Sequence, residues 1–193
     1  MTNNDPPGQI PSGQTAADVP IDLLPVVELT DDQYERAKQL AHRRNKSYNS
    51  IDGGRIYGSQ TSADAHCTGV VGELAYAIKN GLCIDESVYE YGDTGYDLTD
   101  TGLTIDTKTT STQLDRPDLI VPVEPAPSAD LFVLLHRIAP QTVRIVGTAT
   151  YADVVDQEPE KKPGNDLNFV VPQSELRLPR GLARPTSEGQ SHA

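Results

Sequence analysis

Residues 95–110 read GYDLTDTGLTIDTKTT, and this stretch decides which fold class we expect for the chain. Runs of β-prone residues lie on both sides of the turn DTG at 100–102, a pattern typical of an antiparallel hairpin. If residues 101–102 form the loop, Asp97 falls opposite Asp106. If the loop begins one residue earlier, Asp97 lies one same-face step from Asp106. Both registers therefore put the two carboxylates on the same side of the sheet.

The same geometry adds a lysine to the two carboxylates. Side chains two positions apart on a strand share a face, so Lys108 is expected beside Asp106. Neighbouring carboxylates repel each other unless a cation lies between them. Lys108 is one such cation, and a divalent metal ion is another. Hard oxygen ligands of this kind suit Mg²⁺ or Mn²⁺, with water in the remaining positions.

A metal ion held at this hairpin would polarise a phosphoryl oxygen and lower the pKa of a bound water molecule. Lys108 would then orient that water or stabilise the negative charge that develops. A simpler alternative stays open, because the chain contains 28 Asp and Glu residues. In such an acidic protein, a salt-bridged surface hairpin would show the same pattern without any catalytic role.

Two helices are expected before the hairpin. The first begins after Thr30, whose side chain would cap the helix together with Gln33. The second covers residues 64–79, carries Glu73 and ends at 80–81, where Asn-Gly is a common C-terminal stop. The positions at helical spacing that would face the core of the second helix are Val70, Leu74, Ala77 and Ile78.

Further strands are expected after the hairpin, at 118–123, 129–138 and 142–151. The last two are separated by a short loop that contains proline, which predicts a second antiparallel hairpin. Residues 131–135 are all apolar, which places their strand in the centre of a sheet covered on both faces. Helices followed by several strands predict an α/β or α+β domain around a mixed sheet.

The length of 193 residues suits one domain rather than two. Residues 1–24 are rich in Pro, Gly, Asn and Gln and are expected to form a disordered arm, and residues 181–193 a flexible tail. The domain itself is therefore expected at 25–180. No stretch approaches the ~20 apolar residues of a membrane span. The N-terminus also lacks the basic start and the apolar run of a secretory signal.

The net charge is −12, from 16 Lys and Arg against 28 Asp and Glu, which disfavours nucleic-acid binding in dilute salt. Such acidity is also expected of a protein from a very salty cytoplasm, where a Debye length of ~3 Å screens repulsion from DNA. We therefore expect a cytoplasmic protein of a salt-adapted cell or of its virus. An acidic protein with cationic or neutral partners is the alternative.

The positive charges are concentrated in one segment. Between Arg36 and Arg55 there are six Lys and Arg against a single acid, which gives this segment a net charge of +5. Within it, Arg43, Arg44 and Lys46 are the candidates for contact with nucleic-acid phosphates. A helix with a solvated cationic face is the structural alternative.

The order of these elements resembles the PD-(D/E)XK nuclease superfamily, in which a helix with Glu precedes a strand with Asp and a strand with DxK. The matching stretches are GELAYA at 72–77, GYDL at 95–98, IDTKTT at 105–110 and RIVGTATY at 144–151. The chain looks most like small virus- or mobile-element-borne members. The resemblance implies a restriction-endonuclease-like core, with a central mixed sheet flanked by helices.

The resemblance also implies a role for each matching residue. Asp97 and Asp106 would ligate the metal, with the backbone carbonyl of Thr107 as a further ligand. Lys108 would activate water, and Glu73 would help to bind a metal ion or its water. The chain departs from the pattern at 96, where tyrosine replaces the proline, and at 106, where aspartate replaces the commoner glutamate. It also lacks the Gln-x-x-x-Tyr element of recombination exonucleases.

The resemblance thus predicts a Mg²⁺- or Mn²⁺-dependent endonuclease that hydrolyses DNA. A Holliday-junction resolvase or an RNA-directed member remains possible, as does a non-catalytic nucleic-acid-binding or structural protein with the same fold. Thr109, Thr110 and Gln113 follow the lysine and are candidates for contact with the nucleic-acid backbone. His66 lies two helical turns before Glu73, where a surface position or a role beside the water are both open. A homodimer would allow both DNA strands to be cut.

Overall fold

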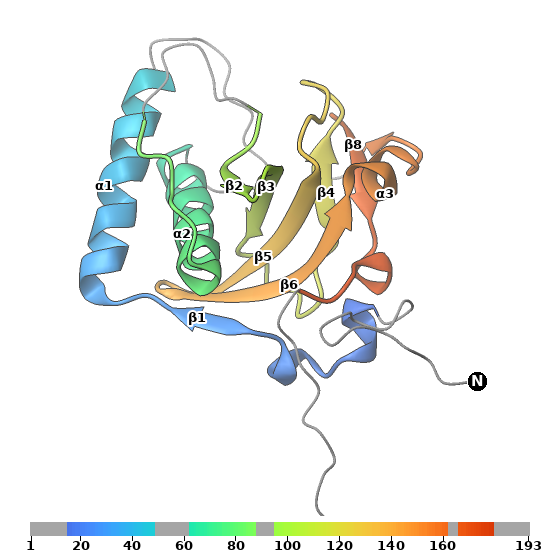
Figure 1. The fold of residues 1–193 in the computed structure, drawn as a ribbon, viewed down its shortest axis with the longest axis horizontal. Coiled ribbons are helices and arrows are strands. Elements are labelled where there is room, and N and C mark those ends of the chain that lie inside the picture. Colours follow the sequence, from blue (N-terminus) through green and yellow to red (C-terminus); the bar gives the residue numbers. More distant parts are fainter. Residues whose placement is uncertain (1–14, 49–61, 88–94, 162–165, 180–193) are drawn as a thin grey trace, which may run out of the picture.

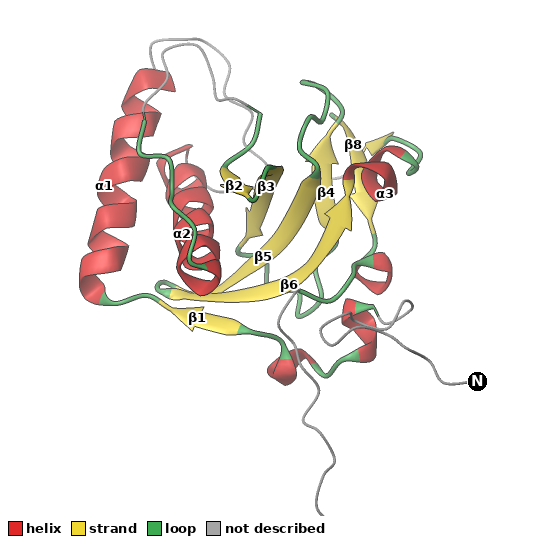
Figure 2. Ribbon diagram, viewed as in Figure 1, coloured by secondary structure: helices red, strands yellow, loops and turns green. Residues whose placement is uncertain are grey.

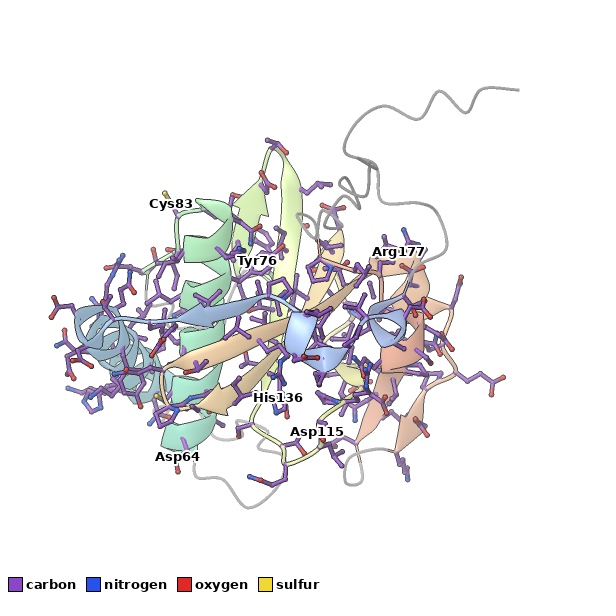
Figure 3. The ribbon with its side chains drawn as sticks, turned by 90° about the horizontal axis from the view of Figure 1, so that it is seen from below. Asp64, Tyr76, Cys83, Asp115, His136 and Arg177 are labelled. Atoms are coloured by element: carbon purple, nitrogen blue, oxygen red, sulfur yellow. The ribbon has the colours of Figure 1, made fainter. Side chains whose placement is uncertain are left out.

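The computed structural model describes residues 15–48, 62–87, 95–161 and 166–179. These residues form three layers, with two long helices on one face of a five-stranded sheet and a smaller sheet on its other face (Figure 1, Figure 2). Figure 3, turned by 90°, shows α2 lying between α1 and the large sheet. No described helix combines the length and the apolar character that a membrane crossing requires.

Helix α1, at Asp31–Tyr48, begins where the sequence predicts. The Thr30 N–H donates to Gln33 Oε1 at 2.9 Å, and the Gln33 N–H donates to Thr30 Oγ1 at 3.3 Å. This reciprocal pair satisfies two backbone donors that the helix cannot satisfy internally. The buried side chains of α1 recur at helical spacing and include Ala37, Leu40 and Ala41.

Helix α2, at Ser62–Asn80, ends at Gly81, which has a φ of +67°. That left-handed conformation suits glycine and lets the Leu82 N–H donate to the Ala77 carbonyl at 2.9 Å. Of the predicted core positions, Val70, Leu74 and Ala77 are buried. The prediction for Ile78 is wrong, because its side chain is 41% exposed and Val71 and Ala75 fill the interior instead.

The large sheet has the strand order β1-β6-β5-β3-β2. Strand β3 runs parallel to β5, and the other neighbouring strands are antiparallel, so the sheet is mixed as predicted. Strand β5 lies in the centre and is covered on both faces, which confirms the reading of its apolar run. The strand bounds are β1 Val26–Glu28, β2 Leu98–Asp100, β3 Leu103–Thr110, β5 Leu131–Ala139 and β6 Thr142–Thr150.

The second face of this sheet differs from the expectation that helices flank it. It is covered by a three-stranded sheet of order β4-β8-β7 and by the short helix α3, at Tyr151–Val155. The crossover from β3 to β5 passes through β4, in which Leu119 and Val121 alternate inward while their neighbours do not. Burial at every second residue is typical of a strand rather than a helix, and this crossover segment pairs in a second sheet. The bounds are β4 Leu119–Pro122, β7 Glu160–Lys161 and β8 Leu167–Val171.

Two apolar cores result from these layers, and they give β3 two different faces. Ile105 belongs to the core between the sheet and the helices. Asp106 and Lys108 pair in register with Phe132 and Leu134, which belong to the core between the two sheets. Because successive strand residues alternate in direction, odd-numbered residues of β3 face α2 and even-numbered ones face the second sheet.

Residues 15–24 belong to the folded domain, although the sequence places them in a disordered arm. They form two 3-10 turns, Ala16–Asp18 and Ile21–Leu23. Ala16 is fully buried, and its N–H donates to the Leu176 carbonyl at 2.7 Å. The fold thus includes about ten residues before position 25, because buried Ala16 and Leu24 anchor the segment in the core between the two sheets. The arm at 1–14 and the tail at 181–193 lie outside the described residues.

Candidate active site

The hairpin of β2 and β3 adopts the first of the two registers that the sequence allows. Asp100 pairs with Leu103, which leaves Thr101 and Gly102 as the loop. Their φ angles are +47° and +93°, and two-residue hairpin loops favour this left-handed region because it matches the strand twist. The register fixes which residues of β3 lie beside the segment that precedes β2.

Asp97 lies immediately before β2 and binds the edge of β3. Its N–H donates to the Ile105 carbonyl at 2.8 Å. Its Oδ2 accepts from the Thr107 N–H and from Thr107 Oγ1, each at 2.7 Å. At this edge of β3, the Asp97 carboxylate thus accepts the backbone hydrogen bond that a neighbouring strand would otherwise accept. The Thr107 carbonyl points toward the same edge, because the N–H and C=O of one strand residue face the same neighbour.

Asp106 and Lys108 lie on either side of Thr107 and share the opposite face of β3. Lys108 Nζ is 2.7 Å from Asp106 Oδ2. The Asp106 side chain is 14% exposed and the Lys108 side chain 33%, so the pair remains accessible to solvent. Asp97 thus binds Thr107 at the edge of β3, while Asp106 and Lys108 contact each other on the face of the even-numbered residues.

Glu73 lies on the helix that packs against the odd-numbered residues of β3. A side chain at the preceding residue, Gly72, would place its Cβ 1.9 Å from Thr109 Oγ1, so helix and strand touch at this point. The Glu73 carboxylate is buried and both of its oxygens accept from Arg44 Nη1, at 2.9 and 2.8 Å. Gly72 thus lies against β3, while the Glu73 carboxylate is bound by an arginine of α1.

The donor atoms at the hairpin are of the kind that a hard divalent ion prefers. Among the described residues, no group of three or more His, Cys, Asp and Glu is arranged to hold a metal ion. Asp97, Asp106 and the Thr107 carbonyl form a smaller set that contains only oxygen donors. Mg²⁺ is commonly bound through one or two carboxylates and keeps several waters, so this set is sufficient in kind.

His66 lies on α2 in the environment of the same arginine. Burial lowers the pKa of His66, and the nearby positive charge of Arg44 lowers it further. Both causes favour the neutral imidazole. A neutral ring accepts a proton or a hydrogen bond, whereas a charged ring would only donate.

The cations predicted to contact phosphates occupy different surroundings. Arg43 and Lys46 are exposed on α1, and Arg43 lies 3.8 Å from a carboxylate oxygen of Glu86. Arg44 instead points inward to Glu73 and also donates to the Asp85 carbonyl at 2.7 Å. Only Arg43 and Lys46 thus present an exposed charge to a ligand.

The polar residues after Lys108 also divide between two environments. Thr109 is directed at α2, and its Oγ1 is buried against Gly72, because it occupies an odd-numbered position of β3. Thr110 Oγ1 accepts from the Thr112 N–H at 3.3 Å. Gln113 is exposed in the loop that follows β3. Of these three, Gln113 is best placed for a surface contact.

The Arg44–Glu73 pair is the contact that sequence reasoning missed. A signal for it exists, because Glu73 stands alone in the apolar run 70–78 and a buried carboxylate requires a cation or hydrogen-bond donors. Comparisons with protein-family models, with curated protein sequences and with solved structures found no match. The functional interpretation therefore rests on the residues of the chain itself.

Proposed function

We propose that this protein is a Mg²⁺- or Mn²⁺-dependent nuclease with a restriction-endonuclease-like core, which hydrolyses phosphodiester bonds in DNA as an endonuclease. The observation that supports this function best is the hydrogen bonding of Asp97 to Thr107, the residue between Asp106 and Lys108. It connects the Asp strand to the DxK strand at the position where the superfamily pattern requires a shared site.

The order of elements gives further support. Helix α2 carries Glu73, the next two strands form the hairpin with the aspartates, and β5 returns parallel to β3. The crossover through β4 departs from a core that is flanked by helices on both faces. Support for the proposal therefore comes from α2 and the hairpin alone, and not from the layer beyond the sheet.

In this mechanism, Asp97, Asp106 and the Thr107 carbonyl would hold the metal ion. When bound, the ion lowers the pKa of a coordinated water and polarises the scissile phosphate. Lys108 donates to Asp106 in the free protein. Its ammonium group is therefore positioned to orient the attacking water and to stabilise the negative charge that forms on the phosphate oxygens.

Substrate contact is expected from exposed side chains of α1 and of the loop that follows β3. Arg43 and Lys46 supply positive charge on α1, and Gln113 supplies an amide beyond the end of β3. The net charge of −12 opposes DNA binding unless salt screens it. The activity is therefore proposed for a salt-rich cytoplasm, in a salt-adapted cell or its virus.

A second candidate function is nucleic-acid binding without catalysis. It is favoured by hydrogen bonds within the protein to two of the proposed site carboxylates. Thr107 donates to Asp97 Oδ2, and Arg44 donates to both oxygens of Glu73. A protein that had lost catalysis could keep the fold by such contacts. The two candidates differ in one measurable property, the metal-dependent cleavage of DNA.

Cleavage of supercoiled plasmid DNA in molar KCl, with Mg²⁺, with Mn²⁺ or with EDTA, tests the proposal. The wild-type protein is expected to nick DNA only with a metal ion, and Lys108→Ala and Asp97→Asn are expected to abolish nicking. Asp130→Asn is the matched control, because Asp130 Oδ2 accepts from the N–H and Oγ1 of Thr104 just as Asp97 does from Thr107. Cleavage by Lys108→Ala at the wild-type rate would refute the mechanism, and metal-independent binding without cleavage would establish the second candidate.

A further inference from the structure

We propose that Arg44 is a positioning residue that fixes the orientation of Glu73, rather than a contact to phosphate. This inference rests on the proposed nuclease function. The Arg44 side chain is 20% exposed and the Glu73 side chain 8% exposed, so the pair lies largely inside the protein. Arg44 therefore does not belong to the exposed basic surface that the sequence predicts for this segment.

The hydrogen bonds of Arg44 join three separate segments. Nη1 donates to both oxygens of Glu73 on α2, and Nη2 donates to the Asp85 carbonyl in the segment that follows this helix. Arg44 itself belongs to α1. A planar guanidinium makes these contacts with fixed mutual geometry, which a single ammonium group cannot reproduce. The carboxylate is thereby held in one orientation relative to both helices.

Both oxygens of Glu73 accept from one guanidinium nitrogen, so the contact fixes the plane of the carboxylate. In the proposed nuclease, this orientation would set how the carboxylate meets the metal site or its water. Arg44 thus acts through Glu73 and touches no reacting atom.

The positive charge of Arg44 also acts on His66 of α2. The Arg44 guanidinium contributes to the lowered pKa of His66, which lies on the same helix as Glu73. The same charge is thus felt at two positions of α2, seven residues apart. A phosphate contact on the outer face of α1 would not require either interaction.

The test is a double-mutant cycle with four proteins, namely the wild type, Arg44→Gln, Glu73→Gln and the double variant. The readout is the rate of plasmid nicking as a function of Mg²⁺ concentration, with Mg²⁺ binding measured separately by calorimetry. We expect Arg44→Gln to lower the rate or the Mg²⁺ affinity by about 10- to 100-fold, as is usual for residues that orient a metal site. In the Glu73→Gln background the same substitution is expected to have little further effect.

Arg36→Gln is the matched control for this cycle. Arg36 also lies on α1 and pairs with a carboxylate of the 81–87 segment, Glu86, but it is half exposed and does not contact Glu73. Its effect is expected to be the same in both backgrounds. If Arg44→Gln does not fold, as judged by circular dichroism, Arg44→Lys replaces it in the cycle.

The outcomes separate this inference from the proposed function. An equal loss on substitution of Arg44 in both backgrounds shows that it does not act through Glu73 and overturns the inference alone. A loss confined to the background that retains Glu73 supports it. A wild-type protein without metal-dependent cleavage removes the proposed function, and the inference with it.

Discussion

Oδ2 of Asp97 lies 2.7 Å from both the backbone nitrogen and the Oγ1 atom of Thr107. This one oxygen satisfies two donors of a buried residue at a position where β3 pairs with β5 on one side but no longer with β2 on the other. A residue proposed to hold a metal ion therefore also stabilises the strand that carries the rest of the site. Its substitution is expected to change stability as well as activity.

Asp97→Ala is expected to lower the free energy of unfolding by about 1–3 kcal/mol, because it leaves the buried N–H and hydroxyl of Thr107 without their acceptor. Urea unfolding followed by circular dichroism measures the change. Asp115→Ala, at an exposed loop position, is the control and is expected to leave the unfolding midpoint unchanged. Equal midpoints for Asp97→Ala and the wild type would show that Thr107 finds another acceptor.

Gly72→Ala is expected to destabilise the protein by about 1–3 kcal/mol, because its new Cβ would overlap the Thr109 side chain and force helix and strand apart. Gly69→Ala on the same helix is the control, because no atom lies within 4 Å of its Cβ position. There the substitution is expected to be neutral or to stabilise by up to about 1 kcal/mol. Thermal unfolding of both variants measures the difference. Equal changes in the free energy of unfolding would contradict the close approach of α2 to β3.

The contact at Gly72 also predicts a compensating change. Thr109→Ala removes the Oγ1 and Cγ2 atoms that the new methyl group would meet at 1.9 and 2.9 Å. The Gly72→Ala, Thr109→Ala double variant is therefore expected to recover part of the lost unfolding free energy. Additive losses in the two substitutions would place the strain elsewhere, since neighbouring sites that share a contact are not additive.

The sequence predicts those parts of the fold whose signals are local. Three such signals are the cap formed by Thr30 and Gln33, the stop at Gly81 and the turn at 100–102. For the turn, the sequence leaves two registers open, and the structure selects the loop at 101–102. The packing of Ala16 against Leu176 could not be predicted in this way. It joins residues 160 positions apart, and neither segment has an apolar pattern of its own.

The site shows the same division. Strand alternation predicts Lys108 beside Asp106, and the two are 2.7 Å apart. That Asp97 shares their face stays a prediction, because its carboxylate binds Thr107 at the edge of β3. The partner of Glu73 depends on how two helices pack, and several arginines on α1 are possible partners at the level of sequence. Helix packing selects Arg44, and only the structure supplies that information.

His66 makes stability depend on pH in a defined direction. Its pKa is lower in the folded protein than the ordinary value of 6.5, so the unfolded chain binds more protons below that value. The free energy of unfolding is therefore expected to fall as the pH drops below about 6.5 and to be unaffected by this residue at higher pH. His66→Gln is expected to flatten the dependence between pH 5 and 7, whereas exposed His42→Gln keeps it. Urea titrations at each pH test this, and an unchanged slope in His66→Gln would exclude the role of this histidine.

Gly147→Ala tests whether the segment at 15–24 belongs to the domain. A Cβ at this position of β6 would lie 2.7 Å from the Cβ of Leu176, 3.1 Å from the Arg177 carbonyl and 3.2 Å from the Cβ of Ala16. Two of these neighbours belong to the chain that crosses β6 and one to the N-terminal segment, so the added methyl group would push both away from the sheet. We expect a loss of about 1–3 kcal/mol in the free energy of unfolding, together with faster amide hydrogen exchange at Ala16, whose N–H donates to Leu176. Exchange at Ala16 that is rapid already in the wild type would show that the segment is not held against the domain in solution.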